Sequence, residues 1–547
     1  MPARSFRPPR SSSWRTAWSA SVTASPTSLR TCCSSGPGVS RSSIEGAGVT
    51  ATGPLAVIDI GSNSARMVVL QLSPGGQLEI LADGRLSLQL ARQLDGRGRL
   101  ENGAVASAIS AVRDFQAIAA AAGAQRTVAV ATAAIRNAVN RDQVVARILA
   151  ETGLAVTVID GDTEARFALL GAVYGLPVET GFVVDVGGGS MELAYFEARR
   201  PMHWWTLPLG SLLTTDRFLH GDPPRTAELA ELRDHVVRML DNAGVPALPD
   251  DGSIVGTGGT VRNIAKVHLR SAGHPITRVD GYTLQRREVR EVTNRLVSRE
   301  LARRRSIPGL SADRADSITG GAVVVTTAME VLGTRTLVVS GHGLREGIAL
   351  AELGIQLPDT ATVRRSSVAS LAAHFETWDA QRADRRQRLV RMLLAATEPG
   401  ADAELLETAE HVATLLDIGQ SVNYYDRCMH AATIVAAADL RGFTHREVAL
   451  IATTLARLGK GRSNLPRFAR LLTRADLPRI DRLAMIVDIA DELDRRLLPG
   501  QFATARADER RGRIIVGTPL EYAWSPVDLM RRFRRRFGRS LVFRPSK

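Results

Sequence analysis

The sequence predicts an α/β protein with two similar lobes facing each other across a cleft, followed by a separate α-helical domain. Strand and helix patterns alternate from Leu55 onwards, as in α/β architectures. A unit of apolar strand, aspartate, small polar turn and returning strand occurs twice, which indicates two similar lobes. After Pro358 strand patterns disappear, and amphipathic helical stretches run from Ser366 to about Asn464. A length of 547 residues is enough for two to four domains.

The first copy of the repeated unit begins with the apolar, β-branched segment Leu55–Ile60, for which we predict a strand. The turn Gly61-Ser62-Asn63-Ser64 follows, and Arg66–Leu72 is the predicted returning strand. Backbone N–H groups in a turn without bulky side chains can converge on a phosphate. Asp59 can hold Mg²⁺ through water, because that ion keeps much of its hydration shell. Taken alone, an aspartate before a Gly-Ser turn also closes many ordinary hairpins.

The second copy strengthens the functional interpretation. It runs from the strand Phe182–Val186, which carries Asp185, through Gly187-Gly188-Gly189-Ser190 to the strand Met191–Tyr195. A third glycine-rich loop, Gly256-Thr257-Gly258-Gly259-Thr260, joins a short strand to a helix. Two carboxylate-bearing turns and a third glycine loop are difficult to obtain by chance, and together they predict a phosphate-binding cleft.

Several helices connect these strands. Helical periodicity predicts a helix over Asn102–Ala122, and another for which Asp162 is the expected N-cap and Tyr174 the last residue. A strand at Thr336–Ser340 leads into a helix after Leu344. We therefore place lobe I at residues 54–178, lobe II at 179–353, and the helical domain with a basic tail at 354–547. A short sheet around 513–516 is a further possibility in that last part.

Residues 1–53 are rich in Ser, Arg, Pro and Thr and show no periodicity. A segment of this composition cannot bury enough apolar surface to fold, so we expect a disordered extension or a mis-assigned translation start, with an organellar transit peptide as the alternative. No run of eighteen or more apolar residues occurs, so a membrane span is not expected. Three cysteines without a disulfide or zinc-ligand spacing favour a reducing, cytoplasmic location.

The formal net charge of +14 favours a polyanionic partner. Polyphosphate, nucleotides, nucleic acid and anionic lipid all fit this charge, and an arginine-rich genome could also produce it without any partner. At the C-terminus, the basic run from Arg531 to Arg539 could bind polyphosphate, RNA or nothing. Phe533 and Phe537 are four residues apart, so on a helix they would share a face and anchor it to the core.

As a set, the motifs resemble those of the exopolyphosphatase and guanosine pentaphosphate phosphatase (Ppx/GppA) family, within the actin-like ATPase superfamily. The resemblance covers residues 54–353 strongly and the helical remainder loosely. It implies two actin-like (ribonuclease H-like) lobes around a cleft. The motifs that carry it are Gly61 to Ser64, Thr132 to Arg136, Glu164-Ala165-Arg166, Asp185 to Leu193, Leu207 to Ser211, and Gly343 to Gly347.

The resemblance also implies roles for individual residues. Glu164 would be the base that activates water, and Arg136 would grip phosphate oxygens. Asp59, Asp185 and Glu192 would hold Mg²⁺. The phosphate-binding residues would be Gly61, Ser62, Asn63, Ser64, Gly187, Gly188, Gly189, Ser190, Gly258 and Gly259. From the residues alone, Glu164 could instead complement a helix dipole, and Arg136 could form a surface salt bridge.

The chain departs from the family pattern in two places. Ala65 and Arg66 stand where the family often has Phe and His, which puts local substrate contacts in doubt. Long members carry a helical domain related to HD phosphohydrolases, whose metal site needs a His-Asp pair. Here Leu416 precedes Asp417, and Leu458 stands where another histidine is expected, so we do not expect a working HD metal site. These helices would instead extend the substrate channel or form a dimer.

The activity that the resemblance implies is Mg²⁺-dependent hydrolysis of the terminal phosphoanhydride bond of inorganic polyphosphate, with release of orthophosphate. Hydrolysis of guanosine pentaphosphate to the tetraphosphate would use the same catalytic set. Two further functions stay open, a non-catalytic polyphosphate- or nucleotide-binding regulator and an ATP-dependent kinase. From the family we also expect a homodimer. Membrane binding and nucleic-acid binding are not expected.

Overall fold

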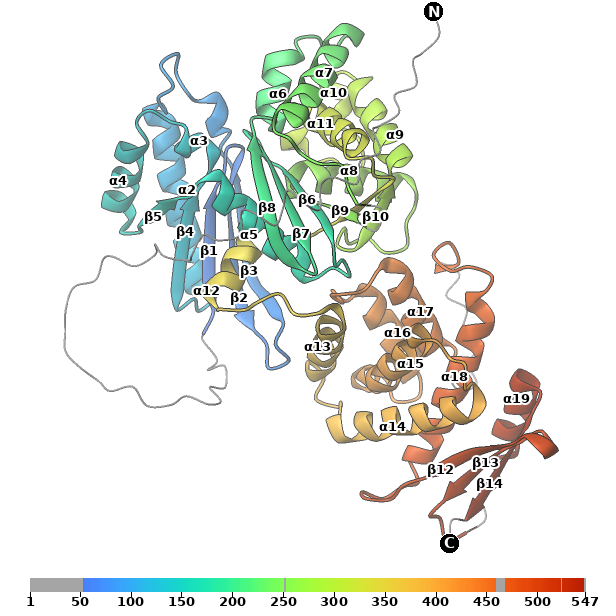
Figure 1. The fold of residues 1–547 in the computed structure, drawn as a ribbon. Coiled ribbons are helices and arrows are strands. Elements are labelled where there is room, and N and C mark those ends of the chain that lie inside the picture. The colour runs from blue at the N-terminus through green and yellow to red at the C-terminus, as the bar shows by residue number, and fades with distance from the viewer. Residues whose placement is uncertain (1–52, 250–251, 459–467, 523, 546–547) are drawn as a thin grey trace, which may run out of the picture. The chain divides into compact units, whose positions relative to one another are not determined.

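The computed structural model describes residues 53–249, 252–458, 468–522 and 524–545. The predicted N-terminal extension, up to residue 52, lies outside these ranges. Two large sheets with flanking helices precede a mainly helical region that ends in a small third sheet (Figure 1). None of the helices in the described ranges combines the length and the apolarity needed to cross a membrane.

The first sheet has the strand order β3-β2-β1-β4-β5. β1 pairs antiparallel with β2 and parallel with β4. Successive side chains of β1 point to opposite faces, and both faces are buried, with Ile58 in one core and Val57 in another. The strands of this sheet are β1 (Leu55–Ile60), β2 (Ser64–Leu72), β3 (Leu78–Ser87), β4 (Arg126–Ala131) and β5 (Val156–Val158).

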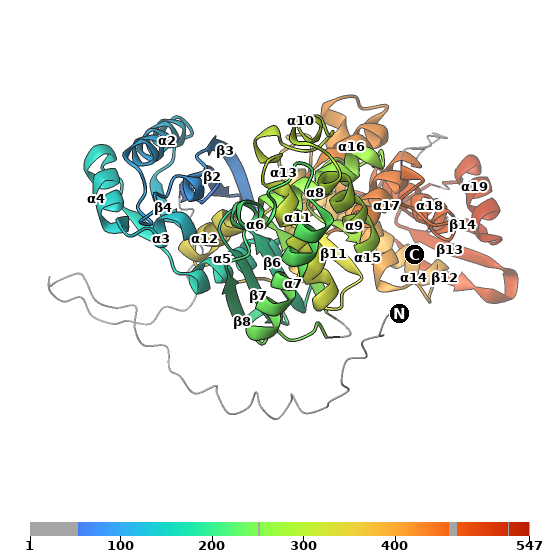
Figure 2. The same ribbon diagram turned by 90° about the horizontal axis from the view of Figure 1, so that it is seen from above.

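Helices cover both faces of this sheet. α2 (Asn102–Ala121) and α4 (Arg141–Thr152) lie side by side and bury one face (Figures 1 and 2). On the other face lie α5 (Gly161–Tyr174) and α12 (Leu344–Glu352), which pack against each other. α12 comes last in the two-lobe region, so the chain returns to the first sheet after completing the second. The short elements nearby are η1 (Leu90–Arg92) and α3 (Ala133–Arg136).

The second sheet repeats the first and adds one strand, with the order β10-β11-β9-β6-β7-β8. β6 pairs antiparallel with β7 and parallel with β9, as β1 does with β2 and β4. The predicted internal repeat is therefore confirmed. The strands are β6 (Gly181–Val186), β7 (Met191–Glu197), β8 (Arg200–Leu207), β9 (Ser253–Thr257), β10 (Tyr282–Gln285) and β11 (Thr336–Val339).

A large core joins one face of this sheet to the helices that follow it, and a separate core packs its other face against α5. α11 is buried along most of its length, as expected for a helix packed on several sides. The helices are α6 (Ser211–Phe218), α7 (Thr226–Asn242), α8 (Gly258–Ser271), α9 (Arg286–Val297), α10 (Leu301–Arg304), η2 (Ala312–Arg314) and α11 (Ile318–Val331).

One predicted helix start is wrong by two residues. We expected Asp162 to be the N-cap of α5, but the helix begins at Gly161 and Asp160 is its N-cap. The Asp160 carboxylate accepts a hydrogen bond from the Thr163 backbone N–H at 2.8 Å, which satisfies one of the free N–H groups of the first turn. Both aspartates suit a cap by composition, and the backbone geometry selects the earlier one.

The C-terminal region is mainly helical, as predicted, and has its own apolar core. The possible short sheet around 513–516 is confirmed, because β13 is the central strand of the third sheet. The helices are α13 (Thr360–Ala373), α14 (Ala380–Thr397), α15 (Ala403–Leu415), η3 (Ile418–Ser421), α16 (Arg427–Ala437), α17 (His445–Ala456), α18 (Asp476–Asp494), η5 (Glu509–Arg511) and α19 (Val527–Phe537). The strands are β12 (Thr504–Asp508), β13 (Arg513–Thr518) and β14 (Ser540–Pro545).

The basic run near the C-terminus forms α19, and Phe533 anchors it. Phe533 is fully buried and its ring stacks on Phe537 at 4.5 Å between centroids. Arg532 forms an ion pair with Asp488 at 2.6 Å, and Arg536 pairs with Asp481. The expected anchoring role of the two phenylalanines is therefore confirmed, and part of the charge run is neutralised within the protein.

Candidate active site between the two sheets

The repeated strands place Asp59 and Asp185 at equivalent positions, one residue before the ends of β1 and β6. Both carboxylates line one pocket, with residues from both sheets around it. The returning strands differ in what they place opposite the aspartates. Arg66 stands opposite Asp59 in the β1–β2 pair, whereas Glu192 stands opposite Asp185 in the β6–β7 pair. One repeat therefore brings a cation to the pocket and the other an acid.

The structure brings together most of the predicted site residues, but not all. Arg136, Gly61, Ser62, Gly189 and Ser190 do not line the pocket. The pocket-lining residues among those predicted are Asp59, Asn63, Ser64, Glu164, Asp185, Gly187, Gly188, Glu192, Gly258 and Gly259.

Neighbouring atoms lie so close to the second and third loops that glycine is needed at several of their positions. A Cβ on Gly188 would lie 3.2 Å from the Asn63 backbone nitrogen, and one on Gly189 would lie 3.0 Å from the Ser62 hydroxyl. The two carboxylate-bearing loops therefore pack directly on each other. Gly258 has a φ of +79°, and a Cβ there would lie 2.0 Å from a carboxylate oxygen of Asp185. A side chain at Gly258 would therefore occupy the space beside Asp185 in the pocket.

Glu164 lies in the first turn of α5, with its side chain only 13% exposed. The Arg136 Nη1 donates to its Oε2 at 2.7 Å and to the Ile159 carbonyl at 3.1 Å. Burial raises the pKa of the Glu164 carboxyl to about 7, against the lowering effect of Arg136. A carboxylate with a pKa near neutrality is well matched to accepting a proton from water.

The other carboxylates of the pocket are also buried. Burial raises the pKa of Asp59 to about 6, and it raises the pKa values of Asp185 and Glu192 as well. Asp59 Oδ1 and Glu192 Oε1 have no hydrogen-bond partner among the described residues. A divalent cation would satisfy these oxygens and relieve the repulsion between the carboxylates.

Asp59, Asp185 and Glu192 do not converge as a direct three-ligand cage. Within the described ranges, the only three ligand-type side chains whose ligand atoms lie within 4.8 Å of one another are Asp280, His342 and Asp439. Carboxylates that share a pocket without converging suit Mg²⁺, which takes few protein ligands and keeps several waters. The residues present therefore fit a hydrated Mg²⁺.

Three arginines that the sequence reasoning did not assign to the site also line the pocket: Arg66, Arg262 and Arg314. No ion pair joins any of them to a carboxylate in the described part of the chain. Arg262 donates only to backbone carbonyls, those of Gly258 and Gly341, and the buried Arg314 Nε has no described hydrogen-bond partner. Burial, and then the charges of Arg262 and Arg314, lower the pKa of Arg66. Mutually repelling cations that no carboxylate pairs with directly, one of them the buried Arg314, favour an anionic ligand.

Part of this arginine set had a signal in the sequence. Arg66 follows the first loop by two residues, and strand alternation puts it on the same side as Ser64. Arg262 lies four residues after Gly258, one helical turn into α8. Arg314 closes the isolated η2 turn, and no local pattern connects it to the loops. Arg345 and Glu346, which also line the pocket, lie in a motif that was noted without a role.

Comparison with known proteins agrees with this geometry. The sequence profile of the Ppx/GppA phosphatase family matches residues 50–355, and that of its domain III matches residues 363–505. Exopolyphosphatase 1 of Mycobacterium tuberculosis is 30% identical over 319 residues, which cover 57% of this chain and 92% of the relative. Exopolyphosphatase 2 of the same species is 31% identical over 316 residues, which cover 55% of this chain and 98% of the relative.

Solved structures show the same fold. An exopolyphosphatase from Cytophaga hutchinsonii superimposes with a TM-score of 0.51 at 22% identity, covering 56% of this chain and 99% of that one. An exopolyphosphatase-like protein gives a TM-score of 0.50 at 28% identity and covers 55% and 97% of the two chains. These comparisons establish an actin-like two-lobe architecture for the part of the chain that carries the pocket.

Proposed function

Since the chain belongs to the Ppx/GppA phosphatase family, we propose that its pocket hydrolyses the terminal phosphoanhydride bond of inorganic polyphosphate and releases orthophosphate. One observation carries this proposal. The same pocket holds Glu164, a carboxylate with a pKa raised to about 7, and three arginines that form no ion pair with a carboxylate in the described ranges. A base poised near neutrality beside arginines that no carboxylate pairs with directly suits attack by water on a phosphate chain.

In the proposed reaction, Glu164 accepts a proton as a water oxygen bonds to the terminal phosphorus. The bond from that phosphorus to the bridging oxygen breaks, and the bridging oxygen stays with the shortened chain. Arg136 holds Glu164 through its Nη1, and a grip on phosphate oxygens would use its other N–H donors. The buried arginines would offset the charge that the terminal group carries in the transition state.

Asp59, Asp185 and Glu192 are the residues that would hold Mg²⁺, directly or through its waters. A bound Mg²⁺ would supply further charge neutralisation at the terminal phosphate oxygens. The loop residues around these carboxylates would orient the phosphates, since Ser64, Gly187 and Gly258 face the pocket. Cytoplasmic location stays a prediction from the sequence, and homodimerisation stays an expectation from the family.

The test is phosphate release by the purified protein with Mg²⁺, offering long-chain polyphosphate and guanosine pentaphosphate in parallel. We expect faster release from polyphosphate. A clear preference for the nucleotide would replace this proposal with guanosine pentaphosphate hydrolysis, for which the same catalytic residues serve and only the contacts to the distal part of the substrate differ. Release from neither, together with tight binding of either, would favour a non-catalytic regulator.

A further inference from the structure

One histidine and two aspartates meet where the second sheet contacts the C-terminal region. The three residues are Asp280, His342 and Asp439, and their ligand atoms all lie within 4.8 Å of one another. Asp280 precedes β10, His342 follows β11, and Asp439 lies between α16 and α17. The group shares no residue with the active-site pocket. It is therefore a separate candidate for a bound ion.

The His342 imidazole points into this group with an unsatisfied nitrogen. His342 is only 7% exposed, and its buried Nε2 has no hydrogen-bond partner among the described residues. Nε2 lies 3.7 Å from Asp439 Oδ2, which is too far for a hydrogen bond. It is close to the separation of about 3.3 Å expected between two ligands of a tetrahedral Zn²⁺. A cation bound there would satisfy a nitrogen whose burial otherwise costs free energy.

The two carboxylates are well placed as ligands. Asp280 is buried, and its Oδ1 accepts a hydrogen bond from the Gly341 N–H at 2.8 Å. Its backbone carbonyl accepts a hydrogen bond from His445 Nε2 at 2.9 Å, which fixes the segment further. The Asp439 side chain is 49% exposed, so an ion can enter from solvent. The group thus combines ligands held by their neighbours with an entry path, as a metal site requires.

Two arginines flank the group without reversing its negative field. Arg441 Nε lies 3.7 Å from Asp439 Oδ2, and Arg278 donates to the backbone carbonyl of the preceding residue at 2.6 Å. Burial and Arg441 act to lower the pKa of His342. The carboxylates of Asp439 and Asp280 outweigh both, so this pKa is raised. Positive charge is therefore favoured beside His342 Nε2, in the form of a proton or of a metal ion.

The donor set selects the class of metal ion. One imidazole nitrogen and two carboxylate oxygens suit Zn²⁺, which binds both kinds of donor and can complete its coordination with water. Mg²⁺ prefers oxygen ligands and keeps several waters, so it competes poorly for a site built around an imidazole. The two arginines should make the affinity for Zn²⁺ lower than that of a closed site with four protein ligands.

We propose that Asp280, His342 and Asp439 form a Zn²⁺ site that links the second sheet to the C-terminal region. Apolar packing already joins these parts, since Ile276 belongs to the core of the C-terminal region. The ion would stabilise this junction further by connecting segments that are far apart in the sequence. The inference does not depend on the proposed hydrolytic activity, so either can fail without the other.

The test uses Co²⁺ as a probe for Zn²⁺, because tetrahedral Co²⁺ absorbs visible light strongly. The full-length protein is stripped of metal with a chelator and titrated with Co²⁺ in the presence of excess Mg²⁺. We expect one equivalent of Co²⁺ with tetrahedral absorption, which Zn²⁺ displaces. His342→Gln and Asp439→Asn should each weaken this binding by about 100-fold or more, because loss of a direct ligand costs at least as much as loss of a supporting contact.

The matched control is His374→Gln, which removes a surface histidine that lies 3.4 Å from Glu79 and belongs to no three-ligand group in the described ranges. It should bind Co²⁺ as the wild type does. Circular dichroism of each metal-free variant checks folding, and the half-exposed Asp439 gives a variant that should fold normally.

Two results would overturn the proposal. One is Co²⁺ binding that is unchanged in His342→Gln and Asp439→Asn, or that is weakened equally in the control. The other is a wild-type protein that binds no Co²⁺ with tetrahedral absorption when Mg²⁺ is present, which would leave a proton as the positive charge between the carboxylates.

Discussion

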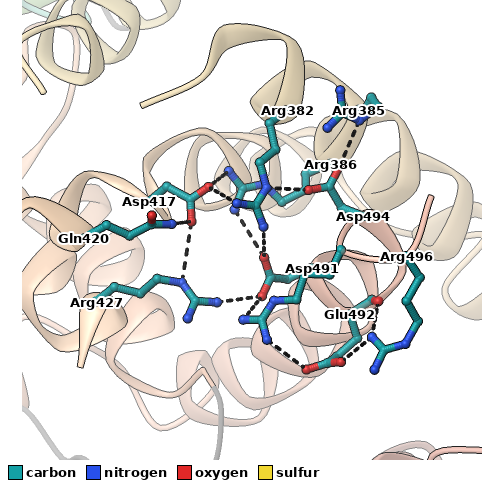
Figure 3. Close-up of polar contacts among 11 residues, drawn as sticks. Arg382, Arg385, Arg386, Asp417, Gln420, Arg427, Asp491, Glu492, Asp494 and Arg496 are labelled. Carbon is teal, nitrogen blue, oxygen red and sulfur yellow. Dashed lines mark hydrogen bonds and ion pairs between the residues drawn. The ribbon is translucent and has the colours of Figure 1, made fainter. Parts of the chain in front are cut away.

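Two clusters of buried charge in this protein use the same residue types in opposite ways. In the C-terminal region, Arg386 is fully buried and bridges two aspartates, Asp417 at 2.5 Å and Asp491 at 3.3 Å, while Arg427 reaches Asp491 at 2.7 Å (Figure 3). In the pocket between the sheets, Arg314 is almost as buried and has no such partner among the described residues. Pairing, more than burial, separates the two clusters.

The pKa values of the aspartates show the same contrast. Burial acts to raise the pKa of Asp417, but Arg386, Arg382 and Arg427 outweigh it and hold that pKa below its usual range. Burial raises the pKa of Asp59 to about 6, because the arginines near it only partly compensate. A network whose charges neutralise one another needs no ligand, whereas pocket arginines that form no ion pair point to an anionic ligand.

The largest effect should come from removing the proposed base. Glu164→Gln keeps the size of the side chain but cannot accept the proton, so kcat should fall by about 10²- to 10⁴-fold. The rate of phosphate release from polyphosphate measures this effect. The control is Glu352→Gln, which alters an exposed ion pair with Arg126 and should keep the wild-type rate. A loss of less than about tenfold would assign the base to another group.

The next largest effect concerns the paired cluster. Arg386→Met should lower the free energy of unfolding by about 3 to 5 kcal/mol, because it leaves Asp417 and Asp491 buried with fewer partners. Urea denaturation measures this, and kcat/KM of the folded protein should not change. Arg388→Met, which breaks an exposed pair with Asp384, should cost less than about 1 kcal/mol. Equal losses in the two variants would mean that the buried network contributes no special stability.

In the pocket between the sheets, removing an arginine should reduce activity and leave stability unchanged or higher, the opposite of the effect expected for Arg386. Arg314→Met should lower kcat/KM by about 10- to 100-fold, since a charge-assisted contact to phosphate contributes about 1.5 to 3 kcal/mol. Its free energy of unfolding without substrate should stay constant or rise, because a buried charge without an ion pair is removed. Marked destabilisation with unchanged kcat/KM would give Arg314 a structural role like that of Arg386.

The smallest effect is a pH dependence. The Glu164 carboxyl must be deprotonated to accept a proton, and burial raises its pKa to about 7. The value of kcat/KM should therefore be highest well above pH 7 and decline as pH falls through that value. Below it, kcat/KM should decrease by nearly tenfold for each pH unit. A pH profile of kcat/KM checks this. The residual activity of Glu164→Gln should lose the decline near pH 7 and keep only a decline near pH 6, where the Asp59 carboxylate proposed to hold Mg²⁺ takes up a proton. A flat wild-type profile between pH 5 and 8 would contradict the assignment.

The strands, loops and repeat could be predicted because their signals are local. β1 and β6 are apolar runs that end in an aspartate and a small-residue turn, so strand type and turn chemistry agree. The start of α5 was wrong because Asp160 and Asp162 are equally good caps in composition. The small third sheet gave only one visible strand signal, since β12 and β14 are mostly not buried, whereas β13 has a run of buried apolar residues.

The site was predicted unevenly for the same reason. Asp59, Asp185 and Glu192 stand beside recognisable loops, and Glu164 stands in a family motif. The arginines are positioned by tertiary structure. Arg66 acquires its role from its register opposite Asp59, and Arg314 reaches the pocket from a distant turn with no periodic pattern. Whether a charged residue has an ion-pair partner depends on the folded structure, and a short stretch of sequence does not reveal it.

The most direct test of the central claim follows the oxygen of the attacking water. Hydrolysis of long-chain polyphosphate in ¹⁸O-labelled water should place the label in the released orthophosphate, because the water held by Glu164 attacks the terminal phosphorus and the bridging oxygen stays with the chain. Mass spectrometry of the products reads this out. Label in the shortened chain, or internal fragments in place of orthophosphate, would contradict the account.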